Sequence, residues 1–160
     1  MKISSRSNHF WHSLPVVLAL SASGVAFAQT PAASCEKTDE KQIAGLFDRW
    51  NASLKTLDAD RVTANYAPNG VLLATVANEP LTTPADIRGY FTKFLKGEPQ
   101  GTINKRFVTV GCNTAQDVGT YTFAFKDGST VSARYTYVYA FADGQWKIAH
   151  HHSSAMPNKM

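Results

Sequence analysis

The sequence predicts an α+β domain in which three N-terminal helices pack on one face of an antiparallel sheet. Between residues 38 and 95 apolar residues recur at helical spacing, whereas from Thr102 onward the chain is rich in β-branched and aromatic residues. The late segments are joined by short turn-like connections such as Asp143-Gly144, so consecutive strands are expected to pair antiparallel. Helices first and strands afterwards are typical of α+β domains.

Residues 1–28 have the layout of a secretory signal peptide. Lys2 and Arg6 give a positive start, an apolar run extends from Leu14 to Phe27, and Ala26-Phe27-Ala28 is a small-x-small cleavage signal. The apolar run is shorter than the roughly 20 residues that a membrane span needs. We therefore expect a periplasmic or secreted protein without a membrane segment after cleavage. A flexible arm over 29–37 and one domain over 38–157 are expected to follow.

Charge and cysteine content narrow the classes of partner. Without Lys2 and Arg6, 14 basic residues face 12 acidic ones, a net charge of +2 with no basic run, so nucleic-acid binding is not predicted. The mature chain has two cysteines, Cys35 and Cys112. In an oxidising compartment we expect them to form a disulfide, although two free thiols stay an alternative because the sequence does not give their separation.

The helices are predicted from caps and apolar spacing. Thr38 is expected to cap the first helix, whose apolar face recurs at three- and four-residue steps. The segment Leu57–Asp60 is expected to end that helix and cap a shorter one that runs to about Tyr66. Thr83 is expected to cap a third helix, with Pro84 in its first position.

The strands are predicted from β-forming runs. Residues 67–70 read as a turn, residues 71–76 as a strand, and residues 79–82 as its return partner or a loop. Four further strands are expected to form the meander: Thr102–Cys112, Asp117–Lys126, Ser129–Phe141 and Gln145–Ser154.

The last two strands carry the candidate functional residues. Strict alternation places Arg134 on one face of its strand and the stripe of Tyr135, Tyr137, Tyr139 and Phe141 on the other. In the final strand it places His150 and His152 with Ile148, and His151 on the opposite face. We expect Arg134 to point inward, the aromatic stripe to lie partly at a subunit contact, and His151 to lie on the outer face.

Several stretches resemble the calcium/calmodulin-dependent protein kinase II association (hub) domain, a branch of the cone-shaped nuclear transport factor 2-like superfamily, and in particular its exported bacterial relatives of the SgcJ/EcaC type. The final segment, Asp143-Gly144-Gln145-Trp146 through His150-His151-His152-Ser153-Ser154, is the most specific. The others are Phe47-Asp48-Arg49-Trp50-Asn51, Tyr66-Ala67-Pro68, Val71-Leu72-Leu73, Tyr90-Phe91 with Phe94-Leu95, and Ala133-Arg134-Tyr135-Thr136.

The resemblance implies a curved sheet, an internal pocket and assembly through the sheet into a homodimer or a larger ring. It does not imply kinase activity, because the chain has no kinase motif. One departure is that the kinase hub has an arginine where this chain has Ser153. The pocket cations would then be Arg134 and Arg106.

The residues predicted to bind a ligand are Arg134, His150, His152, Tyr66, Trp50 and Arg106. A buried guanidinium needs an anion or carbonyl partner, and its fork of donors suits a carboxylate. A small anionic or polar ligand is therefore expected, unless Arg134 forms an internal ion pair with Asp48 or Asp117. His150 and His152 could chelate a metal, but a third ligand is not evident, so neither a metal nor a cofactor is predicted.

Two functions stay open from the sequence. The first is an exported small-molecule-binding or self-associating domain. The second is an isomerase- or cyclase-like enzyme without a metal, using His150 or His152 as the base. Isomerases of this fold use an acidic residue, and the four late strands contain only Asp117 before their turns, so the enzyme is the less favoured alternative.

Overall fold

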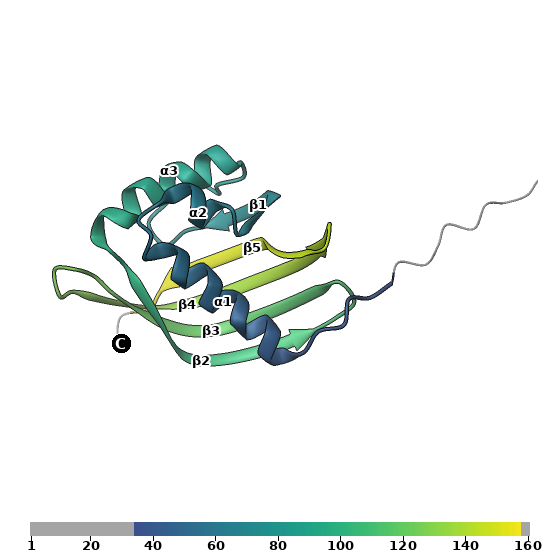
Figure 1. Cartoon of the computed structure of the whole chain (residues 1–160). Coiled ribbons are helices and arrows are strands. Elements are labelled where there is room, and N and C mark those ends of the chain that lie inside the picture. The colour runs from purple at the N-terminus through teal and green to yellow at the C-terminus, as the bar shows by residue number, and fades with distance from the viewer. Residues whose placement is uncertain (1–33, 158–160) are drawn as a thin grey trace, which may run out of the picture. The chain divides into compact units, whose positions relative to one another are not determined.

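The computed structural model describes residues 34–157, so the predicted signal peptide and most of the predicted arm lie outside the described residues. The helices come first, apart from one early strand, and four long strands follow (Figure 1). The elements are α1 (Glu40–Leu54), α2 (Ala59–Thr63), β1 (Tyr66–Leu73), α3 (Pro84–Phe94), the short 3-10 helix η1 (Leu95–Gly97), β2 (Gln100–Val110), β3 (Thr114–Ala124), β4 (Thr130–Ala142) and β5 (Gln145–Ala155). The predicted α+β class is confirmed.

Helix α1 begins one residue later than expected. Its cap is Asp39, whose side chain accepts a hydrogen bond from the backbone N–H of Gln42 at 2.7 Å. Thr38, the predicted cap, instead donates to the side-chain oxygen of Gln42. The predicted apolar face is buried, with Ile43, Phe47, Trp50 and Leu54 directed at the sheet.

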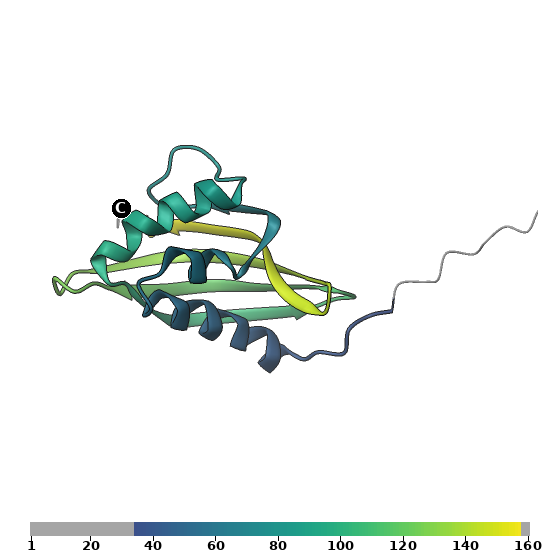
Figure 2. The same ribbon diagram turned by 45° about the horizontal axis from the view of Figure 1, so that its top comes forward.

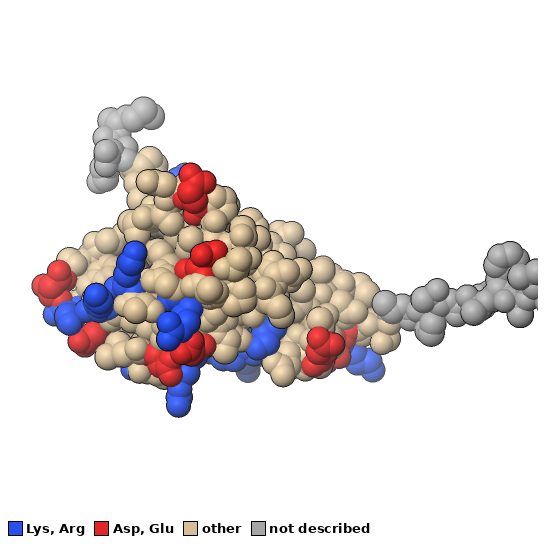
Figure 3. Space-filling view, turned by 90° about the horizontal axis from the view of Figure 1, so that it is seen from above, with Lys and Arg blue, Asp and Glu red and all other residues tan. Residues whose placement is uncertain are grey.

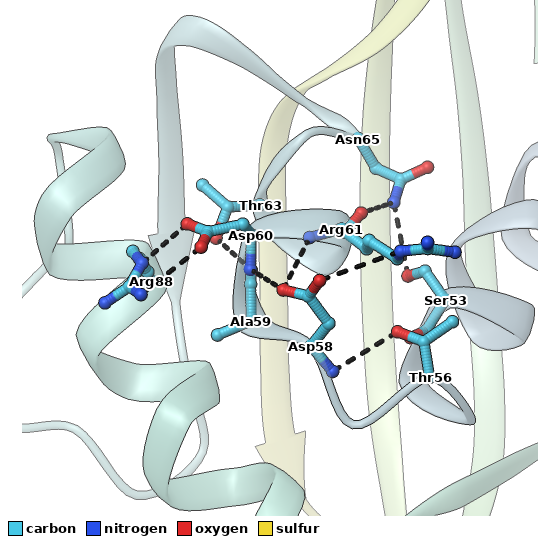
Figure 4. A network of polar contacts seen from close by, with 9 residues as sticks. All are labelled: Ser53, Thr56, Asp58, Ala59, Asp60, Arg61, Thr63, Asn65 and Arg88. Atoms are coloured by element: carbon cyan, nitrogen blue, oxygen red, sulfur yellow. Dashed lines mark hydrogen bonds and ion pairs between the residues drawn. The ribbon is translucent and has the colours of Figure 1, made fainter.

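A network of polar contacts holds the short helix α2 in place (Figure 4). Asp58 caps it, as predicted, by accepting from the backbone N–H groups of Asp60 and Arg61. The buried Asn65 closes its other end, because its side-chain amide donates to the carbonyl of Arg61 at 3.1 Å. Asp60 pairs with Arg88 and so joins α2 to α3. Helix α3 begins at Pro84 after the predicted cap Thr83.

The strands form one sheet in the order β1-β5-β4-β3-β2. The meander from β2 to β5 is antiparallel, as predicted, but β1 adds to its edge in parallel with β5. The predicted hairpin after β1 is reduced to a single bridge between Leu72 and Leu81. The predicted turn at residues 67–70 lies inside β1 as a shift of register. Gly70 is required there, since a Cβ would lie 2.8 Å from the carbonyl oxygen of Ile148.

The helices cover one face of the curved sheet and leave the other open (Figures 1 and 2). The core between the helices and the sheet is strongly aromatic and includes Trp50, Phe91, Tyr121 and Tyr137, each about 1% exposed or less. Viewed from above, the surface carries basic and acidic side chains interspersed (Figure 3). Within residues 34–157 no helix is both long and apolar enough to span a membrane.

The described end of the arm, residues 34–37, is tied to the turn between β2 and β3. Cys35 and Cys112 form a disulfide. Asn113 adds two hydrogen bonds, because its side chain donates to the carbonyl of Ser34 and accepts from the backbone N–H of Glu36. The chain before α1 is therefore anchored to the turn between β2 and β3, 77 residues further along the sequence.

Candidate functional site

The tyrosine stripe of β4 and Arg134 each lie on the face of the sheet opposite to the one predicted. Tyr135, Tyr137 and Tyr139 are buried beneath the helices, whereas Arg134 is exposed and donates only to the carbonyl of Ala155 at 3.4 Å. The predictions that Arg134 points inward and that the aromatic stripe lies at a subunit contact are therefore wrong. The physical reason is that three tyrosine rings remove far more apolar area from water than the residues that alternate with them.

A β-bulge in β5 makes the histidines exchange faces as well. Val138 pairs with His150 and Tyr139 pairs with Ile148, so Ala149 is an extra residue in β5. As a result Ile148 and His151 both face the helices, three residues apart. His151 is 4% exposed, whereas His152 is exposed on the other face. The prediction that His151 lies outside and shares no face with Ile148 is wrong.

The predicted residues Arg134, His150 and His152 are brought close together, but on the open face. Thr136, the second residue after Arg134 in β4, pairs with His152, and Val138, the next residue of that face, pairs with His150. His150 is half-buried, and Arg134 and His152 are exposed. They lie on the side of the sheet away from the helices, so they do not line an internal pocket.

A cavity of about 110 Å³, partly open to the surface, lies between the helices and the sheet. Its walls are mostly carbon, because seven of the fifteen lining residues are aromatic and five more are aliphatic. None of the lining residues is an Asp, Glu, Lys or Arg. The lining residues are Trp50, Leu72, Ala74, Thr75, Val76, Tyr90, Phe91, Phe94, Tyr121, Phe123, Phe125, Val131, Ala133, His151 and Ser153.

His151 is a polar residue in the wall of this cavity. Its Nδ1 lies 2.8 Å from the hydroxyl of Tyr66, and its ring stacks on Tyr137 with centroids 4.1 Å apart. Trp50 packs against it edge-on at 5.6 Å. Its Nε2 is buried and has no hydrogen-bond partner among the described residues. Burial, together with the neighbouring His150 and His152, lowers the pKa of His151 to about 3, so the ring is neutral at physiological pH.

The cavity's hydroxyl groups are bonded to one another. Tyr121 donates to Ser153 at 2.6 Å, and Thr75 lies 2.6 Å from the same hydroxyl. A cluster of neutral hydroxyls therefore occupies this part of the wall. Burial raises the pKa of Tyr121 well above its usual value, so this cluster stays uncharged.

Two predicted wall residues, Trp50 and Tyr66, lie inside the domain. Trp50 lines the cavity, and Tyr66 is one hydrogen bond away through His151. The sequence analysis missed His151, Tyr121, Ser153 and Thr75. The signal that could have placed His151 inside was the tyrosine stripe of the neighbouring strand, since His151 pairs directly with the buried Tyr137.

Arg106 belongs to a second, part-buried cluster outside the cavity, centred on Asp117. Its Nε lies 3.1 Å from the carboxylate of Asp117, which also accepts a hydrogen bond from the Tyr135 hydroxyl at 2.8 Å. Asp117 is fully buried, and Arg106 also lies over the ring of Phe47. The sequence analysis considered Asp117 as a partner for Arg134; its partner is Arg106.

The pH dependence of stability is expected to reveal the cost of burying Asp117. Burial raises its pKa above the ordinary 3.8, although Tyr135 and Arg106 act in the opposite direction. In the window just above pH 3.8 the folded protein therefore holds this proton more tightly than the unfolded chain, and the free energy of unfolding falls as pH rises. Asp117→Asn has no such proton to lose.

Urea unfolding of both proteins between pH 3 and 7 checks this. We expect the stability of the unaltered protein minus that of Asp117→Asn to decrease with rising pH, the difference removing the contributions of all other groups. A difference that grows with pH would mean that Arg106 and Tyr135 outweigh burial.

The residues that the structure describes contain no group of three or more His, Cys, Asp or Glu side chains suited to holding a metal ion. The donors of the two buried clusters are single residues set among aromatic rings, which is a poor ligand set for a divalent cation.

Comparison with known proteins agrees with the fold described above. The family model of the calcium/calmodulin dependent protein kinase II association domain matches residues 39–157. A Xanthomonas campestris protein assigned to the same domain is 44% identical, with a TM-score of 0.73 over 84% of this chain and 100% of that one. No curated protein matches.

More distant solved structures share the fold. An NTF2-like protein of unknown function from Pseudomonas putida is 21% identical, with a TM-score of 0.66 over 76% of this chain and 88% of that one. An NTF2-like protein with a cystatin-like fold from Novosphingobium aromaticivorans is 13% identical, with a TM-score of 0.63 over 76% and 84%. The match to the family model spans nearly all of the described residues, and the chain therefore belongs to the calcium/calmodulin dependent protein kinase II association domain family.

Proposed function

We propose that this protein is an exported domain that binds one small molecule in the cavity beneath its helices. The observation that carries the proposal is an apolar cavity with His151 in its wall, whose Nε2 is buried and has no hydrogen-bond partner among the described residues. A buried polar group without a partner costs about 1–3 kcal/mol, and a ligand atom in the cavity would remove this cost. Ligand pockets in proteins are commonly apolar with a few such polar groups.

Native mass spectrometry of the protein purified from the periplasm tests the binding proposal. Ala133 and Arg134 are adjacent in β4, but Ala133 lines the cavity and Arg134 lies on the open face. Ala133→Leu fills part of the cavity and is expected to abolish any co-purifying small-molecule mass, or to weaken its retention at least about tenfold. Arg134→Ala is the matched control and is expected to retain it.

The opposite pattern, with the ligand lost in Arg134→Ala and kept in Ala133→Leu, would place the ligand on the open face. An empty protein in every case would sink small-molecule binding. Circular dichroism of both variants shows whether a loss reflects the cavity or a failure to fold.

We also propose that the domain associates with copies of itself through the open face of the sheet. The family is an association domain, and no element of residues 34–157 covers this face (Figure 1). Phe107, Val118, Thr136 and His152 form a row across its four strands, with Phe107 58% exposed. A second copy would bury this aromatic side chain, as large exposed apolar groups are buried at protein interfaces.

Phe107→Glu is expected to weaken self-association by at least about tenfold, since it places a charge in the centre of the proposed interface. Light scattering coupled to size-exclusion chromatography measures the change in mass over a range of concentrations. Leu57→Glu is the control, because Leu57 is similarly exposed, at 52%, but follows α1 on the helical side. A variant at Phe107 that keeps the mass of the unaltered protein would exclude this face as the interface.

The enzyme alternative has less support. His150 and His152, the predicted bases, lie on the open face and not in the cavity. His151 does line the cavity, but a pKa of about 3 makes its ring a weak base.

Export is part of the proposal. The disulfide between Cys35 and Cys112 supports it, because disulfides persist in oxidising compartments and are rare in the cytosol. The signal-peptide layout of residues 1–28 supports it independently.

A further inference from the structure

We propose that the ligand of the cavity is an uncharged compound with a single aromatic ring and one hydrogen-bond acceptor, which accepts from the Nε2–H of His151. This inference rests on the proposed binding function and names the chemical class of the ligand. It follows from the size of the cavity, its lack of charge, and the hydrogen bonds that fix the His151 ring.

The size of the cavity limits the ligand to one ring. Its volume of about 110 Å³ is somewhat smaller than the roughly 150 Å³ of an apolar engineered cavity that holds benzene. Three of its lining residues, Val76, Tyr90 and Phe94, also line an adjacent surface groove under α3. Val76 is 80% exposed, so this groove offers the route by which a ring enters.

The lack of charge excludes an anion. No Lys or Arg lines the cavity, and His151 is neutral, so a buried carboxylate would lose its hydration without gaining a counter-charge. The hydroxyls of Ser153, Tyr121 and Thr75 are already bonded to one another. The expected small anionic ligand therefore does not suit this cavity.

The hydrogen bond between Tyr66 and His151 determines which ring nitrogen carries the proton. Burial raises the pKa of Tyr66 far above its usual value, so its hydroxyl keeps its proton. Nδ1 of His151 is the one hydrogen-bond partner of this buried hydroxyl among the described residues. If Nδ1 carried the hydrogen, the Tyr66 O–H and the Nε2 lone pair would both be left unpaired, so the Tyr66 hydroxyl donates its proton to Nδ1.

With Nδ1 accepting, Nε2 of the neutral ring bears the hydrogen and acts as a donor. Stacking on Tyr137 and edge contact with Trp50 hold the ring in one orientation. The donor is thus preorganised, and a ligand acceptor gains the bond without paying to order it. The aromatic walls favour a ring through stacked and edge-to-face contacts.

A matched set of probes tests this on the unaltered protein. Benzonitrile and ethynylbenzene are nearly identical in shape, but only the nitrile is a good acceptor. We expect benzonitrile to bind about 5–30-fold more tightly, because the hydrocarbon leaves Nε2–H unpaired. Benzoate, the anionic probe, is expected not to bind at concentrations that saturate benzonitrile. The nitrile stretching frequency of the bound probe is expected to be higher than that of benzonitrile in hexane, because accepting a hydrogen bond raises this frequency.

A substitution tests whether the N–H of His151 is the hydrogen-bond donor to the ligand. His151→Phe keeps a ring against Tyr137 and removes the N–H, so the preference for benzonitrile over ethynylbenzene should fall to about one. His152→Phe on the open face is the control and should keep the preference. If His151→Phe does not fold, the affinity ratio and the nitrile frequency in the unaltered protein still decide.

Equal affinities for benzonitrile and ethynylbenzene, tighter binding of benzoate, or failure of all three probes would overturn the inference. A non-aromatic or charged compound released from the unaltered protein and absent from Ala133→Leu would also overturn it, while leaving the proposed binding function intact. The absence of any bound compound in native spectra is the result that counts against the binding function itself.

Discussion

Replacing Gly119 with alanine is expected to lower the free energy of unfolding by about 3 kcal/mol, at the upper end of overpacking effects. Gly119 pairs with Arg106 directly beside a bulge in β2, where Ile103 pairs with Tyr121 and Lys105 with Thr120. A Cβ at Gly119 would overlap the carbonyl oxygen of Lys105 and lie 2.8 Å from its carbonyl carbon. These are backbone atoms of a paired strand, so relief requires the strands to move apart.

Gly45→Ala is the matched control for this prediction. Gly45 lies within α1, and a Cβ there would meet no atom within 4 Å. Alanine should therefore stabilise the protein by up to about 1 kcal/mol through its higher helix propensity. Urea unfolding measures both variants. Equal stability of Gly119→Ala and the unaltered protein would show that the strands separate at little cost.

Removing the disulfide with Cys35→Ser and Cys112→Ser together is expected to lower the free energy of unfolding by about 2–4 kcal/mol. The two residues are 77 apart in the sequence, so the bond removes much of the freedom of the unfolded chain. In the folded protein the same bond holds the start of α1 beside the turn that contains Asn113.

Denaturant unfolding with and without a reductant measures this effect and supplies its control. A reductant should shift the midpoint of the unaltered protein to that of the double variant, and should leave the double variant unchanged. If the double variant is as stable as the oxidised protein, then the disulfide does not contribute to the free energy of unfolding, and the prediction is wrong.

Most of the secondary structure could be predicted because its signals are local. The caps Asp58 and Thr83, and Pro84 at the first position of α3, act within a few residues of themselves. The strand runs and the Asp143-Gly144 turn likewise determine antiparallel pairing between neighbours. The parallel pairing of β1 with β5 joins segments about 80 residues apart, and no local pattern in either segment indicates it.

The candidate site was predicted less well, because strict alternation fails at a bulge. The extra residue in β5 turns His151 inward and His150 outward, and the shift in β2 lets Ile103 and Arg106 both face the helices. The bulge in β5 thus supplies the core with the buried His151, and the shift in β2 brings the part-buried Arg106 beside the buried Asp117. The prediction that His151 lies on the face opposite Ile148 would have been right in a strand of unbroken pairing.

The sequence by itself determined the class of fold, the family and the helix boundaries to within about three residues, and it identified the two cysteines that the structure shows to be bonded. Only the tertiary structure decided which face of the sheet is the inside. That choice depends on the total apolar area that the helices bury, and on register shifts between strands, which are properties of pairs of segments. For this reason the candidate ligand residue is His151 and not Arg134: the buried tyrosines leave Arg134 on the open face, and the one-residue shift in β5 turns His151 inward.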